Sequence, residues 1–188
     1  MKTELNHSKS RAGFTLIEMI GVLAIIAILA AILVPKIVSA ISDSRFSSTV
    51  ASINSCKAAS MSYYGKNTSF GTNTYAFDGS LVTGNFLENL VAFKLGTGSA
   101  LEVTNVAGSG GTAAAAYKLD GVNTITGTAV VECVLTNVAA ADAMELSKRI
   151  DGTALSTNVV TAADVVGRVV YAAPVAGLTT VYVYLAHQ

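Results

Sequence analysis

The feature that most constrains this chain is an uncharged apolar run near its N-terminus, from Met19 to Pro35. With the residues before it, back to Phe14, it makes a stretch of 22 residues interrupted only by Thr15 and Glu18. At a rise of about 1.5 Å per residue, a helix of this length covers ~33 Å, enough to cross the ~30 Å hydrocarbon core of a bilayer. Because a segment in lipid must satisfy its own backbone hydrogen bonds, the run is predicted to be a membrane-spanning helix.

The charges that flank this run predict its orientation. Lys2, Lys9 and Arg11 precede it with a single acid, Glu4, and the first basic residue after it is Lys36. Since basic residues are retained on the cytoplasmic side of a membrane helix, the N-terminus is expected in the cytoplasm. The prediction before any assembly is therefore a single-pass inner-membrane protein with a periplasmic head.

A cleaved secretory signal is the alternative interpretation of these residues. Basic residues, an apolar stretch and the small-residue sequence Val38-Ser39-Ala40 would make such a signal, and cleavage would leave Ile41 first. Glu18 argues against it, because a carboxylate inside a membrane helix costs about 3 kcal/mol and points to a function. The run is also long for a signal, and Pro35 and Lys36 separate it from the supposed cleavage site.

The residues that open the run form a specific motif, Gly13-Phe14-Thr15-Leu16-Ile17-Glu18. The stretch GFTLIEMIGVLAIIAILAAILVPKI resembles the N-terminus of type IV pilins and type II secretion pseudopilins, over about residues 8–60. The resemblance implies that a prepilin peptidase cuts after Gly13 and methylates the new N-terminus at Phe14, which makes residues 1–13 a leader peptide. It also matches Glu18 to the intramembrane glutamate of the family, and Pro35 to a proline often found where the helix leaves its apolar section.

Elementary electrostatics gives Phe14 and Glu18 a shared role. Cleavage after Gly13 would leave a cationic α-amine on Phe14, and a cation buried in an apolar filament core needs an anionic partner. If helices stack with an axial offset, the amine of an arriving subunit meets Glu18 of its neighbour and fixes the register of assembly. Two simpler alternatives stay open: Glu18 extends to the lipid headgroups, and Pro35 only kinks the helix.

The helix is predicted to continue beyond the membrane. No Pro or Gly occurs between Lys36 and Tyr64, and Gly65 fits a C-cap. Residues at steps of three or four form an apolar stripe suited to packing against a sheet: Phe46, Val50, Ile53, Cys56, Ala59 and Tyr63. The other faces are rich in Ser and Ala, which fits either close approach of further helices or a solvated face. The expected helix has about 50 residues, with 14–35 in lipid or a filament core and 36–65 as its amphipathic half.

Residues 66–188 are predicted to form a globular head with an antiparallel sheet. β-branched and alternating residues indicate strands, and Pro174-Val-Ala-Gly177 indicates a hairpin between the last two. The expected strands are Leu101–Val106, Thr128–Thr136, Asp164–Ala173 and Thr179–Ala186, and short helices are expected at Asn85–Phe93 and Ala140–Ile150. A sheet packed on one long helix is an α+β architecture, and this order of elements also resembles the pilin pattern.

The two cysteines, Cys56 and Cys133, fall on the helix stripe and on an apolar strand. The periplasm permits disulfides, and a bond between them would join helix to sheet. Closing a loop of about 77 residues would add roughly 4 kcal/mol of stability in the chain-entropy model. Two buried free thiols are the alternative, and both remain open.

Composition argues against most catalytic and metal-binding functions. The two histidines, His7 and His187, lie near opposite ends of the chain, and no Cys or His spacing typical of a zinc site occurs. The Gly-rich segments lack the residues of a phosphate or dinucleotide loop. With 12 Lys+Arg against 12 Asp+Glu the net charge is zero, which gives no support to a nucleic-acid partner. We therefore expect no enzyme, no metal and no cofactor.

Together these patterns predict a structural subunit of a type IV pilus, polymerised through its N-terminal helix into a cell-surface fimbrium. The resemblance implies its partners: copies of itself and other pilins, the prepilin peptidase, the inner-membrane assembly platform with its ATPase, and an outer-membrane channel. One alternative is a type II secretion pseudopilin in a periplasmic pseudopilus. Another is a membrane-anchored or secreted binding protein that uses the N-terminus only for export.

Overall fold

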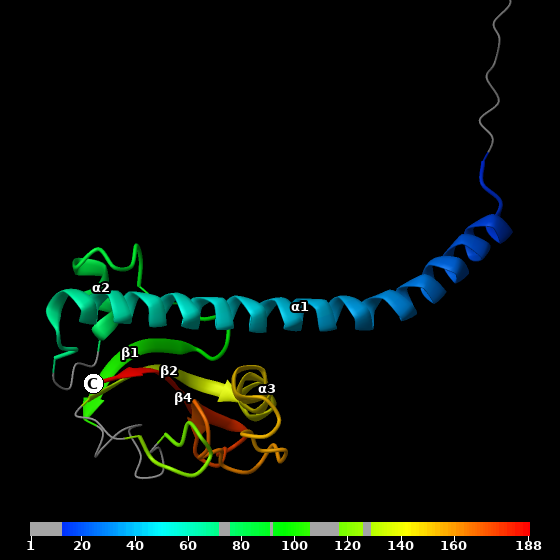
Figure 1. The fold of residues 1–188 in the computed structure, drawn as a ribbon. Helices are drawn as coiled ribbons and strands as arrows, with labels where there is room; N and C mark the ends of the chain where they lie inside the picture. The colour runs from blue at the N-terminus through cyan, green and yellow to red at the C-terminus, as the bar shows by residue number, and fades with distance from the viewer. Residues whose placement is uncertain (1–12, 72–75, 91, 106–116, 126–128) are drawn as a thin grey trace, which may run out of the picture. The chain divides into compact units, whose positions relative to one another are not determined.

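The computed structural model describes residues 13–71, 76–90, 92–105, 117–125 and 129–188 and has an α+β architecture (Figure 1). Its elements in chain order are α1 (Leu16–Asn67), α2 (Phe77–Thr83), β1 (Gly98–Asn105), β2 (Ala129–Ala139), α3 (Ala140–Asp151), β3 (Val169–Tyr171) and β4 (Leu178–His187). A long N-terminal helix followed by an antiparallel sheet confirms the predicted pilin-like architecture. The chain divides into two compact units, and the boundary between Asp43 and Ser44 falls inside α1.

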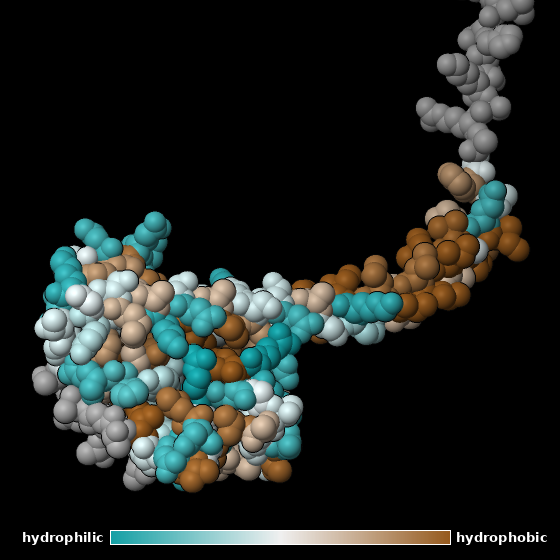
Figure 2. Space-filling model, in the orientation of Figure 1, coloured by the Kyte–Doolittle hydropathy of each residue, from teal (hydrophilic) through white to brown (hydrophobic). Residues whose placement is uncertain are grey.

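The part of α1 before this boundary is apolar and exposed. Every residue from Gly13 to Ile41 is exposed, and the large side chains among them are almost all Ile, Leu, Val, Met or Phe. Figure 2 shows this part of the helix as a largely hydrophobic surface. Among the described residues, α1 is the one helix that is long and apolar enough to cross a membrane. Exposure of such a surface to water is unfavourable, so an apolar environment around it would lower the free energy.

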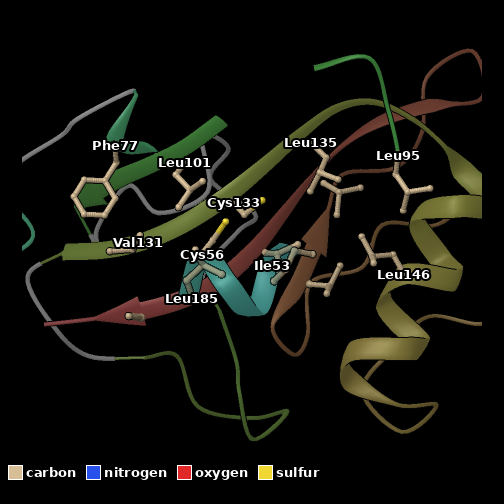
Figure 3. Close-up of a cluster of buried hydrophobic side chains, with 14 of the residues drawn as sticks. Ile53, Cys56, Phe77, Leu95, Leu101, Val131, Cys133, Leu135, Leu146 and Leu185 are labelled. Carbon is tan, nitrogen blue, oxygen red and sulfur yellow. The ribbon is translucent and has the colours of Figure 1, made fainter. Parts of the chain in front are cut away.

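The part of α1 after the boundary buries one side. Four residues of the predicted apolar stripe are buried, Phe46, Ile53, Cys56 and Ala59, while Val50 and Tyr63 are only partly buried against the core. The polar residues Thr49 and Ser60, which the stripe did not include, are buried beside them. Ile53 and Cys56 lie in one continuous core with residues of the sheet, among them Leu101 of β1 and Cys133 of β2 (Figure 3). The stripe forms because residues three and four apart share one helix face.

The sheet has four antiparallel strands in the order β1-β2-β4-β3. One row of paired residues crosses it from edge to edge, Leu101, Cys133, Val183 and Val169, and all four are buried. β1 and β3 are the edge strands of this sheet. The long central strands β2 and β4 supply most of the apolar face that meets α1.

The hairpin between β3 and β4 confirms the predicted turn. Val175 and Leu178 pair across it, and Ala176 and Gly177 between them have φ of 52° and 80°. Two central residues with positive φ make a type I′ turn, whose twist matches that of antiparallel strands. The register then places Val181, Val183 and Leu185 in the main core. Tyr182 and Tyr184 lie on the opposite face, as the alternation in the sequence predicts.

A second, smaller cluster covers that opposite face of the sheet. Tyr117, Val130, Val170 and Tyr184 form it. Glu132 is fully buried on β2 and accepts a hydrogen bond of 2.6 Å from the Tyr117 hydroxyl. A carboxyl group at this depth requires such a partner, because a buried polar group without a hydrogen bond is costly to desolvate.

The predicted helix at Asn85–Phe93 is wrong. The short helix of this region, α2, lies earlier in the chain, at Phe77–Thr83. The described residues between Gly84 and Leu90 form turns and bends instead of a helix. The amides of Phe86 and Leu87 both donate to the Leu81 carbonyl, and Asn85 has a φ of 60°, so the backbone turns away from the helix axis. The predicted strand Asp164–Ala173 shortens to β3, while α3 occupies the range expected for the second short helix.

Candidate functional site

The candidate site is the N-terminal end of α1 together with the exposed apolar surface of the helical residues that follow it. We call residues 14–41 the apolar segment. Among residues 14–35 of this segment, Glu18 is the one acidic or basic side chain. The site is thus an interaction surface with a single anionic group near one end, and it lies entirely within the first compact unit.

Glu18 forms a capping box with Thr15 at the start of the helix. The Thr15 amide and the Thr15 hydroxyl each donate to Glu18 Oε2 at 2.8 Å. The Glu18 amide donates back to Thr15 Oγ1 at 3.3 Å. These bonds satisfy backbone and side-chain groups that a helix start otherwise leaves to solvent. In lipid, where water is scarce, such local satisfaction is worth more than at an aqueous helix end.

The sequence analysis did not identify Thr15 as the partner of Glu18 in this capping box. The signal for it is present, because Thr15-Leu16-Ile17-Glu18 has the Thr-x-x-Glu spacing of a capping box just before an apolar helix. The structure therefore gives Glu18 a defined local partner in a single chain. The expected pairing of Glu18 with an N-terminal amine concerns neighbouring subunits and stays a proposal.

Gly13 and Phe14 lie just before the helix. Neither is helical, both are exposed, and Phe14 is 85 % exposed. A Cβ built on Gly13 would meet no atom of the described residues within 4 Å. Within the described residues, the peptide bond between the two residues is therefore sterically open.

Pro35 lies inside the continuous helix α1. It has no amide hydrogen, so the carbonyl four residues earlier lacks its usual helical donor. The Ser39 hydroxyl donates to the Pro35 carbonyl at 3.1 Å. A helix-interior proline of this kind locally weakens the backbone hydrogen bonding of the helix.

The remaining predicted site residues, Cys56 and Cys133, lie in the core of the second unit rather than at its surface. Both are free and buried in this structure. Burial is the main cause that raises the pKa of Cys56 to about 11, and burial also raises the pKa of Cys133 well above its usual value. Within the described ranges, no three His, Cys, Asp or Glu side chains come together in a way that could hold a metal ion.

Comparison with known proteins identifies the N-terminal region. Residues 8–34 match the family model described as the prokaryotic N-terminal methylation motif, which is the signature of type IV pilins and pseudopilins. No curated protein and no solved structure gives a significant match to the chain. The match includes Gly13, Phe14, Thr15 and Glu18, so it covers the sterically open peptide bond and the capping box together.

Proposed function

We propose that this protein is a structural subunit of a type IV pilus. It is made as an inner-membrane precursor, cut after Gly13 by a prepilin peptidase, methylated on Phe14 and polymerised through α1. In this proposal residues 1–13 are the leader, 14–35 form the transmembrane and later filament-core helix, 36–65 form the amphipathic half, and 66–188 form the head. The protein acts by assembly and catalyses no reaction.

The observation that carries the proposal is the coincidence of the methylation motif with an exposed apolar segment. The motif covers residues 8–34, and the apolar segment presents its side chains to the surroundings along its whole length. A signal that served only for export would have no need for Glu18, whose charge is costly in lipid. A filament built from such helices uses both features: apolar surface for packing, and Glu18 for register.

Assembly then follows from two physical terms. Apolar helices transferred from lipid into a bundle gain close van der Waals packing. The new α-amine on Phe14 carries a positive charge that is expensive to bury, and Glu18 of an adjacent subunit offers the compensating carboxylate. Pro35 weakens the helix near the point where it leaves the membrane, which lets this segment adjust as the subunit leaves the bilayer.

The proposed location and partners follow from this sequence of events. The precursor stands in the inner membrane with its N-terminus in the cytoplasm and its head in the periplasm. Its partners are the peptidase, the assembly platform with its ATPase, other pilins, copies of itself and an outer-membrane channel.

The second candidate is a type II secretion pseudopilin, because the same methylation motif marks both groups. Its filament would remain in the periplasm and support protein secretion. Electron microscopy of intact cells and a secretion assay on a deletion strain separate the two. Loss of surface filaments with normal secretion supports the pilin, whereas loss of secreted enzymes without any surface filament supports the pseudopilin.

The mature N-terminus tests the proposal directly. Mass spectrometry of the protein isolated from its membrane is expected to find a chain that begins at N-methyl-Phe14. A chain that begins at Ile41 would overturn the proposal, because it would show that a signal peptidase had removed the apolar segment. That result would leave a secreted binding protein as the better interpretation.

A further inference from the structure

Two cysteines from distant parts of the sequence lie in one buried core of the second unit. Cys56 comes from α1 and Cys133 from β2, and both belong to the same buried cluster. Their exposed fractions are 2 % and 0 %. Figure 3 shows the Cys56 side chain directed from α1 toward β2, where Cys133 lies. Burial first, and then the charge of Cys56, raise the pKa of Cys133.

We propose that Cys56 and Cys133 form an intramolecular disulfide when this chain folds in an oxidising compartment, and that the bond joins α1 covalently to the central strand β2. The compartment rests on the proposed function, because the head meets oxidising conditions once it is exported. Cys133 pairs with Leu101 on one side and Val183 on the other, so the bond would attach the helix to the interior of the sheet.

The chemistry is thiol–disulfide exchange with a disulfide oxidant, either a protein dithiol oxidase or oxidised glutathione. The thiolate of one cysteine attacks the oxidant and forms a mixed disulfide, releasing one thiol of the oxidant. The second cysteine then attacks the mixed disulfide, forms the Cys56–Cys133 bond and releases the other thiol. Two electrons pass from the cysteine pair to the oxidant, and the two protons end on its thiols.

Burial sets the order of events. Exchange requires a thiolate, and in the folded chain burial and then the negative charge of Asp78 raise the pKa of Cys56 to about 11. The thiolate of Cys133 is also disfavoured, because burial raises the pKa of this thiol well above its usual value and the side chain has no exposed surface. The bond therefore forms before the core closes. Once the core has closed, either redox form is protected from reagents in solution.

The disulfide would add a covalent link between α1 and β2, which are otherwise held together by side-chain packing alone. The bond closes a loop of about 77 residues and removes much of the conformational freedom of the unfolded chain. For a domain of this size we expect the chain refolded in reduced glutathione to melt on the order of 10 °C below the chain refolded in oxidised glutathione.

The test uses the full chain in detergent, unfolded with reductant and then refolded in oxidised or reduced glutathione. After oxidative refolding we expect a mass lower by that of two hydrogens. The cysteines should resist alkylation in denaturant, and mass spectrometry should find a peptide pair linking Cys56 to Cys133. Two alkylated cysteines, or glutathione adducts in place of the linked peptides, would overturn the proposal.

The double variant Cys56→Ala/Cys133→Ala is the matched control. Its melting temperature is expected to be the same after refolding in oxidised or in reduced glutathione, while that of the natural chain is lower after refolding in reduced glutathione. An equal difference between the two refolding conditions in both proteins would also overturn the proposal. Neither measurement needs a filament or an export step, so failure here and failure of the pilus proposal, which the mature N-terminus reports, are distinguishable.

Discussion

At the scale of single residues, Glu18 combines two properties that substitutions can separate. Its side chain accepts the Thr15 amide and hydroxyl, which is a geometric property, and it carries a charge in an apolar segment. A glutamine at position 18 keeps an acceptor oxygen and the capping-box spacing but has no charge. An alanine at position 15 removes the hydroxyl and leaves the charge in place.

We predict that Glu18→Gln and Glu18→Ala are inserted and cleaved normally but do not assemble, because the N-terminal amine of the next subunit then lacks an anionic partner. Thr15→Ala is expected to assemble, since it loses only local capping worth roughly 0.5–2 kcal/mol. Immunoblots of precursor and mature chain report cleavage, and electron microscopy of the assembled fraction reports filaments. Normal filaments from Glu18→Gln would refute the charge-pairing role.

Asp120 provides a pH-dependent prediction in the head. Its carboxylate accepts the amides of Val122 and Asn123 and the Asn123 side-chain amide, at 2.9, 2.7 and 2.7 Å. The Val122 amide first, and then both Asn123 groups, lower the pKa of Asp120 from 3.8 to about 2. A carboxyl with a lowered pKa in the folded state stabilises the fold above its unfolded pKa, and that contribution is lost as the pH falls through the folded value.

We therefore predict that the natural chain is more stable than Asp120→Asn at pH 5, and that the difference shrinks between about pH 4 and pH 2. The asparagine keeps an acceptor oxygen for the amides but does not titrate, which makes it the matched reference. Urea denaturation of the two full chains in detergent, at several pH values, measures the difference. Parallel stability curves down to pH 2 would contradict the prediction.

The residue-scale features differ in how far the sequence reveals them. Glu18 stands out because a carboxylate in an apolar run is costly wherever the chain folds. Thr15 was overlooked although its spacing to Glu18 is a known local pattern. The hydrogen bond between Tyr117 and Glu132 could not be predicted, because it joins residues that only the completed fold brings together.

At the scale of elements, α1 is the most predictable part of the molecule. Its stripe follows from a 3.6-residue period that holds over many turns, and the structure buries Phe46, Ile53, Cys56 and Ala59 as the pattern requires. The short helix α2 illustrates the opposite case. Its sequence, Phe-Asp-Gly-Ser-Leu-Val-Thr, has weak helix propensity, and no side chain caps its start. Burial of Phe77 and Leu81 holds it in place, so tertiary packing overrides local preference.

Ile53 tests the helix-to-sheet packing. It is 1 % exposed and belongs to the main core, so Ile53→Ala is expected to lower the free energy of unfolding by about 2–5 kcal/mol. Met61 lies on the same helix but is exposed, so Met61→Ala should change it by no more than about 0.5 kcal/mol. Urea denaturation, monitored by near-ultraviolet circular dichroism, measures the free energy of unfolding of both variants. Similar small effects at the two positions would mean that the stripe does not carry the packing.

At the scale of the whole molecule, the sequence predicted which segments form the long helix and the strands better than it predicted the order of the strands in the sheet. Alternation and turn residues mark where strands lie, but the order β1-β2-β4-β3 depends on pairing between segments far apart in the chain. The β1–β2 and β2–β4 pairings are both non-local, and such pairings leave little trace in a single sequence. The type I′ hairpin between β3 and β4 was predictable because a local turn defines it.

The two compact units also separate the two physical tasks of the chain. Among the described residues, the buried apolar ones lie from Phe46 onward, in the second unit, and residues 14–41 of the first unit are exposed. Removing residues 1–43 therefore removes exposed apolar surface and leaves the core complete. Ser44 then stands first, and serine is a favourable residue at a helix start.

We predict that a Ser44–Gln188 fragment is soluble without detergent, monomeric and folded, and that it does not form filaments. Its near-ultraviolet circular dichroism should match that of the full chain in detergent, because the aromatic side chains of the core keep their surroundings. Size-exclusion chromatography and a cooperative urea transition test the prediction. An aggregated fragment, or one without a cooperative transition, would show that the head needs the apolar segment to fold. In that case the second unit would not fold independently of the first. The low proportion of charged residues in the head would then indicate that it depends on its neighbours.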